Sequence, residues 1–133
     1  MDKVVVRQDR DFRAEITAQG EEDDALHPVT HVHELSPYTM MLTSLGLCTT
    51  IVLHTYAQHH DVALELAEIT VTYHREEHRD LDADRPYEEW IEERLSLEGD
   101  LTDAERERLA HVGHACSIRK MLESGIEVRT ENG

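Results

Sequence analysis

Two cysteines, Cys48 and Cys116, are the residues of this chain best suited to chemistry. Cys48 lies within LSPYTMMLTSLGLCTTIVLHTYA, a stretch without Asp, Glu, Lys or Arg in a chain of which 32% is charged. Cys116 lies in HVGHACSIRKML, after a glycine and before two basic residues. A thiolate attacks the oxygen–oxygen bond of a peroxide, and a second thiol in reach prevents over-oxidation of the first. The pair therefore indicates redox chemistry.

The sequence around each thiol predicts a different reactivity. A stretch that excludes charge is buried, and burial without a nearby cation raises the pKa of a thiol, so we expect Cys48 alone to be inert at neutral pH. Cys116 follows a helix break and precedes Arg119 and Lys120, which favours its thiolate. The alternative for Cys48 is a purely structural role as a small core residue.

The ten histidines are the other candidate ligands. His31 and His33 would share one face of a strand, and His111, His114 and Cys116 together offer three zinc ligands. Neither group has a fourth ligand or the pattern of a closed zinc site, so we expect no metal and no cofactor. A Walker loop, a dinucleotide fingerprint and a nucleophilic serine elbow are all absent from the sequence.

Length and charge narrow the class of protein. The 133 residues suit one domain, residues 1–133. Two cysteines are too few for a secreted disulfide scaffold, and the N-terminus lacks the apolar core of a signal peptide, so we expect a cytoplasmic protein. The net charge of -16 argues against nucleic acid as a partner, because phosphates are bound by clustered Lys and Arg. This acidity fits either a solvated surface or adaptation to high salt.

An α+β arrangement is predicted to position the two thiols. Ser36 and Pro37 open a helix that runs to about His59 and is apolar nearly all round, as a central buried helix would be. Its uncharged stretch is long enough to cross a bilayer, but proline, histidine and several hydroxyl residues dilute it, and no basic flank marks an inner side. We therefore expect no membrane span.

The remaining elements are expected before and after this helix in the sequence. Thr102 and Glu105 form a capping box that starts a second helix, which Gly113 interrupts and residues 116–123 resume. We expect an acidic turn at residues 20–24 and a charged loop at residues 75–86. Alternating or β-prone runs predict strands, the first two as a hairpin, over residues 3–6, 12–17, 29–34, 66–74, 91–98 and 126–130.

Two motifs resemble those of the OsmC/Ohr superfamily. SPYTMMLTSLGLCTTIVLHTYA is similar to the family's central-helix signature, in which a proline-led helix carries a cysteine after a small-residue turn. GDLTDAERERLAHVGHACSIRKML resembles the family's second helix, which ends in a cysteine. The likeness extends from Phe12 over most of the chain, and SPY, LGLCTT and TYA are closer to the general OsmC-like branch than to the dedicated organic hydroperoxide reductases.

The resemblance implies an OsmC-like fold, with antiparallel strands wrapped around a buried central helix in an intertwined homodimer. It implies that Cys48 is the peroxidatic residue and Cys116 the resolving one, with a small organic hydroperoxide as substrate, an external dithiol as reductant and a role in the oxidative stress response. Arg13 is the best candidate for the arginine that holds the thiolate in the peroxidase members, and Arg7 and Arg10 are the next candidates.

Two positions depart from the peroxidase pattern. The family's glutamate at the start of the central helix falls on Tyr38, and the proline that follows the second cysteine is replaced by Ser117. The missing carboxylate keeps a second hypothesis open. In it the protein is a non-enzymatic binding module that holds a hydrophobic or acyl ligand in a cleft at the dimer interface, and the cysteines only line that cleft.

Overall fold

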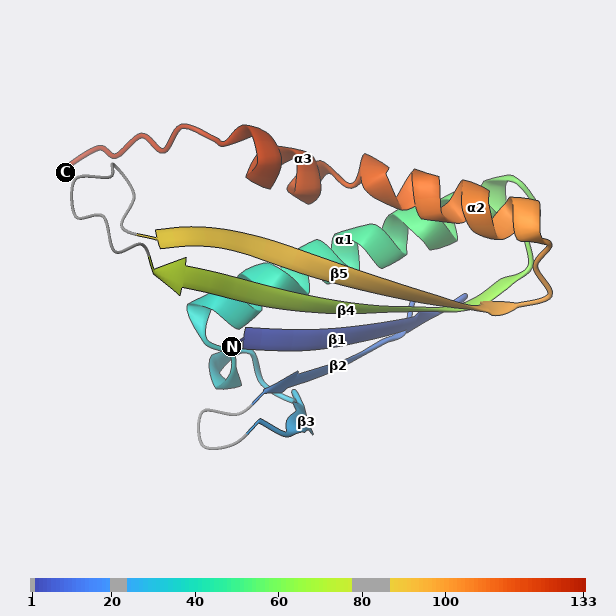
Figure 1. The fold of residues 1–133 in the computed structure, drawn as a ribbon, viewed down its shortest axis with the longest axis horizontal. Coiled ribbons are helices and arrows are strands. Elements are labelled where there is room, and N and C mark those ends of the chain that lie inside the picture. Colours follow the sequence, from blue (N-terminus) through green and yellow to red (C-terminus); the bar gives the residue numbers. More distant parts are fainter. Residues whose placement is uncertain (1, 20–23, 78–86) are drawn as a thin grey trace.

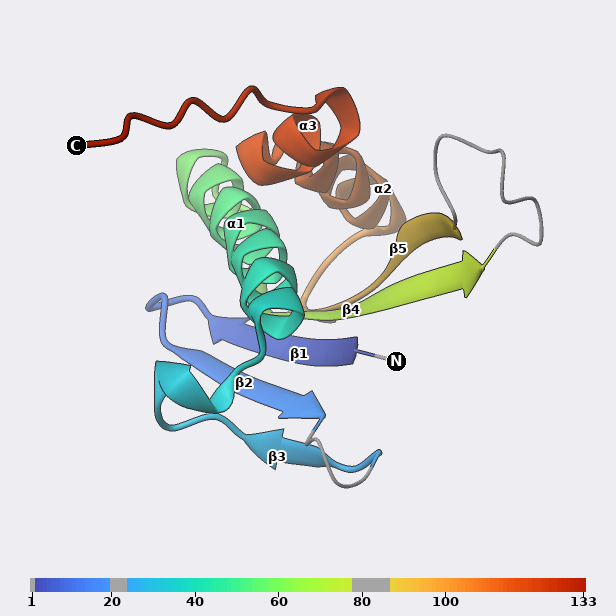
Figure 2. The same cartoon turned by 90° about the vertical axis from the view of Figure 1, so that its left-hand side faces the viewer.

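An antiparallel sheet carries the helices on one face (Figures 1 and 2). The structure is a computed structural model and describes residues 2–19, 24–77 and 87–133. Within this part of the chain the strand order is β3-β2-β1-β4-β5, which confirms the predicted α+β class. The strands are β1 (Asp2–Asp9), β2 (Ala14–Gln19), β3 (Leu26–Pro28), β4 (Leu64–Glu77) and β5 (Tyr87–Gly99); the helices are α1 (Pro37–His59), α2 (Asp103–Val112) and α3 (Ser117–Ser124), with 3-10 turns η1 (Val32–Glu34) and η2 (Gly113–Ala115).

The core lies between α1 and the inner face of the sheet. Alternate residues of β4 are buried against the helix, as the period-two pattern of residues 66–74 predicts. On β1, Val4 and Val6 are fully buried in the same cluster, next to Leu42 of the helix. Gly46 allows this close approach, because a Cβ there would lie 2.9 Å from Cγ2 of Val6.

Helix α1 begins where the sequence predicts. The side chain of Ser36 accepts a hydrogen bond from the backbone N–H of Thr39 at 3.2 Å, and Pro37 occupies the first helical position. His54 is buried in this apolar helix because its Nε2 donates to the backbone carbonyl of Gln8 at 2.7 Å. That bond satisfies a ring nitrogen that would otherwise be costly to bury, and it fixes the helix to the end of β1.

One face of α1 is exposed in the single chain, although the nearly all-round apolar sequence predicts a central buried helix. Met40 is 40% exposed and Ile51 is 44% exposed. Together with Ser44 and Thr55 they form an uncharged stripe, here called the α1 stripe, at spacings of four, seven and four residues. By length and composition α1 is apolar enough to cross a membrane. Half of its apolar 18-residue segment is buried against the rest of the fold, however, so α1 is the core helix of this domain.

Two predicted strands are wrong. In place of a strand over residues 29–34, β3 ends at Pro28 and Val32–Glu34 is a 3-10 turn. Proline lacks the N–H that a continuing ladder needs, although Val29 still donates to the carbonyl of Ile16. Residues 126–130 alternate as a strand would, but they carry no regular structure and leave Ile126 and Val128 exposed.

The other boundaries differ mainly in length. The hairpin of β1 and β2, the capping box of Thr102 with Glu105, and the break at Gly113 are confirmed. Strand β5 begins at Tyr87, and β4 continues to Glu77, into the segment expected to be a loop. The rest of that expected loop and most of the acidic turn lie outside the described residues.

Candidate functional site

The two cysteines meet where the start of α3 packs on the middle of α1. Cys116 is the N-cap of α3, and its sulfur accepts a hydrogen bond from the backbone N–H of Arg119 at 3.4 Å. Cys48 lies opposite on α1, with its Sγ 3.9 Å from Oγ of Ser117. Cys116 is fully buried, whereas Cys48 is partly exposed, and both are free thiols.

The pKa of the Cys48 thiol is lowered in this position. Burial is the largest single influence and raises the pKa, but hydrogen bonds from the Cys116 thiol, the backbone of Ile118, and the hydroxyl and backbone of Ser117 together outweigh it. The backbone donors of Ser117 and Ile118 belong to the first turn of α3, where unpaired N–H groups stabilise a nearby anion. Cys48 is thus the thiol that ionises more readily.

The pKa of Cys116 is raised, chiefly by burial and then by the hydrogen bond to Cys48. In that bond Cys116 donates, so the bond favours a protonated Cys116 beside an ionised Cys48. Both directions are opposite to the sequence-based expectation. The neighbourhood of Cys48 in the sequence shows its own helix but gives no indication that the N-terminus of another helix lies against it.

Arg119 turns away from the thiols. Its Nη1 lies 3.0 Å from Glu93 on β5, and its Nε lies 2.8 Å from Glu123 on α3. The guanidinium therefore fastens α3 to the sheet, and through α3 it holds Cys116 in place. The sequence predicts that the positive charge of Arg119 favours the Cys116 thiolate. In the structure that charge is paired with the two glutamates instead.

The other two predicted site positions lie elsewhere within one chain. Arg13 is exposed in the turn after β1, where its backbone pairs with Asp9, and among the described residues no contact joins it to Cys48. Tyr38 is ten residues before Cys48 on α1, roughly 15 Å along the helix axis, and its ring lies against that of Tyr73 with the centroids 4.9 Å apart. Within the described part of one chain, neither residue is in contact with the Cys48 thiol.

A groove of about 650 Å³ opens beside the N-terminal half of α1, between that helix, α3 and the hairpin of β4 and β5. Its aromatic residues are Tyr38, Tyr73, Tyr87 and Trp90. Methionine, leucine and isoleucine side chains also line it. We call this the aromatic groove. Neither cysteine lines it.

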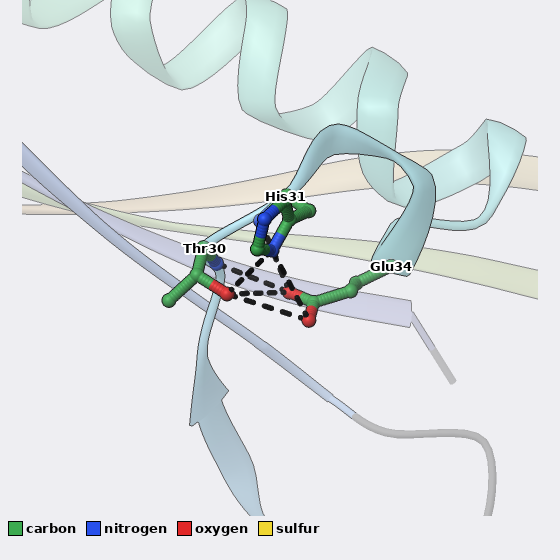
Figure 3. A network of polar contacts seen from close by, with 3 residues as sticks. All are labelled: Thr30, His31 and Glu34. Carbon is green, nitrogen blue, oxygen red and sulfur yellow. Dashed lines mark hydrogen bonds and ion pairs between the residues drawn. The ribbon is translucent and has the colours of Figure 1, made fainter.

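The histidines are arranged differently from the predicted strand pair. His31 and His33 belong to the 3-10 turn and its N-cap, with ring centroids 5.3 Å apart. Figure 3 shows His31 with Thr30 and Glu34, whose carboxylate accepts from the backbone N–H of Thr30 at 3.0 Å and of His31 at 3.2 Å. These two bonds lower the pKa of Glu34. In the described ranges, no group of three or more His, Cys, Asp or Glu is placed to hold a metal ion.

Comparisons with known proteins agree with this fold. The family model described as OsmC-like protein matches residues 29–131, so the chain belongs to the OsmC-like protein family. Among solved structures, an OsmC-like hydroperoxide resistance protein from Jannaschia sp. ccs1 is similar, with a TM-score of 0.64 and 12% sequence identity over 97% of this chain and 91% of that one. No curated protein matches the sequence.

Proposed function

We propose that this OsmC-like protein is a thiol peroxidase that reduces small organic hydroperoxides, with Cys48 as the attacking thiol and Cys116 as the resolving thiol. The observation that carries the proposal is the contact between the two thiols, in which the pKa of Cys48 is lowered and that of Cys116 is raised. A peroxidatic thiol must be ionised and accessible, whereas a resolving thiol need only lie in reach of the sulfenic acid that forms.

The catalytic cycle balances with one external reductant. The Cys48 thiolate attacks one oxygen of the O–O bond and becomes a sulfenic acid, and the alkoxide leaving group takes up a proton to become an alcohol. The Cys116 sulfur then displaces the sulfenic hydroxyl, which leaves as water, and a Cys48–Cys116 disulfide forms. An external dithiol reduces that disulfide to two thiols and is itself oxidised to a disulfide.

The active form is proposed to be a homodimer built on the α1 stripe. Exposed apolar side chains on an uncharged helix face mark an interface in soluble proteins. The stripe is centred between residues 47 and 48, so a second α1 packed antiparallel against the first would place each Cys48 close to the two-fold axis.

Peroxide consumption with a dithiol present tests the proposed function. The wild-type protein should consume cumene hydroperoxide catalytically, and Cys48→Ser should reduce the rate to that of the buffer with dithiol alone. Cys116→Ser should slow turnover and leave a Cys48 sulfenic acid that dimedone traps. If Cys48→Ser consumed peroxide as fast as the wild type, the proposal would be wrong.

The binding-module hypothesis remains as a second candidate because of the aromatic groove. Its volume is that of a small-molecule site. An acyl ligand with a free carboxylate suits it poorly, since the described residues that line the groove include three glutamates and one arginine. Should both thiols stay inert toward peroxide, ligand binding in this groove would become the leading function.

A further inference from the structure

The aromatic groove has a wall that includes three tyrosine rings. Tyr38 from α1 and Tyr73 from β4 lie 4.9 Å apart between centroids with a tilt of 34°, and Tyr87 of β5 follows further along the hairpin. The residues that line the groove come from α1, α3, β4 and β5, the elements labelled in Figure 2. Aromatic faces carry negative electrostatic potential, so such a wall attracts a cation as well as apolar groups.

The charges of the groove have an excess of carboxylates. Among its described lining residues, Glu93 and Glu123 share the single guanidinium of Arg119. The third carboxylate, Glu89, accepts a hydrogen bond from the hydroxyl of Tyr73 at 2.7 Å. That donor is neutral, so it orients the Glu89 carboxylate without cancelling its charge.

The tyrosine that orients Glu89 stays protonated. Its hydrogen bond to Glu89 is the main cause that raises the pKa of Tyr73 to about 12, with burial second. At neutral pH the phenol therefore donates, and the negative charge at this end of the groove belongs to Glu89. A fixed carboxylate thus lies beside the tilted pair of Tyr38 and Tyr73.

The same hairpin already holds a cation against a ring. Cζ of Arg75 lies 4.8 Å from the centroid of Tyr87, within the range of a cation–π contact. Arg75 itself does not line the groove, and the Tyr38–Tyr73 pair, with Glu89 beside it, is the part that we assign to a ligand cation.

We propose that the aromatic groove binds an organic cation, an ammonium group on an apolar or aromatic body. The ammonium would lie between the Glu89 carboxylate and the faces of Tyr38 and Tyr73, and the body would lie on the apolar side chains of α1 and α3, such as Met41 and Leu122. This site is separate from the thiols and does not depend on the proposed peroxidase activity.

Three ligands with one body test the proposal: 3-phenylpropylammonium, 3-phenylpropanol and 3-phenylpropanoate. Trp90 is the single tryptophan of the chain and lines the groove, so its fluorescence reports occupancy in the intact protein. We expect the ammonium to bind about fivefold or more tightly than the alcohol, with that preference decreasing at high salt. The carboxylate should give no saturable change.

Two variants locate the ammonium. Glu89→Gln keeps an acceptor for Tyr73 but removes the charge, and should abolish most of the preference for the ammonium over the alcohol. Tyr38→Leu, at a side chain that is 43% exposed and therefore tolerant of change, should weaken the ammonium more than the alcohol. Glu107→Gln on the exposed face of α2 changes net charge equally and should leave all three affinities unchanged.

Equal binding of ammonium and alcohol by the wild type would overturn the proposal, as would equal losses in Glu89→Gln and Glu107→Gln. Absence of saturable binding for all three ligands would also overturn it, and would show that the groove is closed in solution, for example by a second copy of the chain.

Discussion

The Cys48 thiol is surrounded by donors that come from α3, an element far along the chain from its own helix. Burial alone would keep it protonated, and the hydrogen bonds from the start of α3 and from Cys116 reverse that effect. Ser117 contributes both a hydroxyl and a backbone N–H, where the proline of the peroxidase pattern would offer neither. The departure at this position therefore adds donors to the thiolate.

A series at Ser117 tests this reading. Ser117→Ala removes one donor and should slow alkylation of Cys48 by iodoacetamide at pH 7 about two- to fivefold, because the loss raises the pKa of Cys48. Ser117→Pro removes both donors yet suits the first helical position, so it should slow alkylation further. Mass spectrometry of Cys48 peptides across a pH series measures the effect.

Ser124→Ala, at the other end of α3, is the matched control, and Cys48 of this variant should be alkylated at the wild-type rate. If Ser117→Pro were to alkylate as fast as the wild type across that pH series, the donors at the start of α3 would not be what lowers the pKa of Cys48.

The sequence identified the two thiols as candidates but did not predict which of them has the lower pKa. Cys48 is noticeable because it lies in an uncharged stretch, and Cys116 because it follows a helix break and precedes basic residues. Their pKa order depends on which helix end packs on which helix face, and the approach of Ser117 to Cys48 is a tertiary contact across 69 positions. The Arg119–Glu93 pair was missed for the same reason.

Among the elements, those with local signals were predicted well. Ser36 with Pro37, and Thr102 with Glu105, mark helix starts by hydrogen bonds that close within four residues. The wrong predictions concern segments that form a strand only if a neighbouring strand pairs with them. Residues 126–130 have a strand pattern but find no ladder in the described part of this chain, and β3 stops at Pro28, before the turn that Glu34 stabilises.

Gly99 is an element boundary that permits no side chain. Its φ is +150°, and a Cβ there would lie 2.0 Å from the carbonyl oxygen of Ala63. Gly99→Ala should therefore destabilise the fold by about 3 kcal/mol, because β5 must separate from the start of β4. Urea denaturation measures the change in the free energy of unfolding.

Gly113→Ala is the control for that measurement, since Gly113 has helical φ and a Cβ there would make ordinary contacts of 3.5 Å and longer. It should be neutral or stabilise by about 0.5 to 1 kcal/mol. Equal destabilisation by the two substitutions would contradict the close approach at Gly99.

At the scale of the whole molecule, one chain leaves apolar surface uncovered. The α1 stripe, the aromatic groove and the C-terminal segment with Ile126 and Val128 all expose apolar side chains, although the protein carries a net charge of -16. The resemblance to the OsmC/Ohr superfamily implies a homodimer, but the sequence could not show which face of the central helix one chain leaves exposed.

Ile51 lies in the α1 stripe and tests the proposed homodimer. Ile51→Glu should convert a dimer to a monomer or prevent stable folding, because a carboxylate would be buried without a partner. Ala104→Glu adds the same charge on exposed α2 and should remain dimeric. Light scattering at low micromolar concentration gives the mass, and a stable wild-type monomer would contradict the proposal.

The most direct test of the central claim is mass spectrometry of the intact protein after treatment with a small excess of cumene hydroperoxide, without a dithiol. The account predicts that the chain loses two hydrogens and that digestion yields one peptide pair joined by a Cys48–Cys116 disulfide. Dithiothreitol should restore the original mass. Two thiols that remain reduced after prolonged exposure would contradict the account.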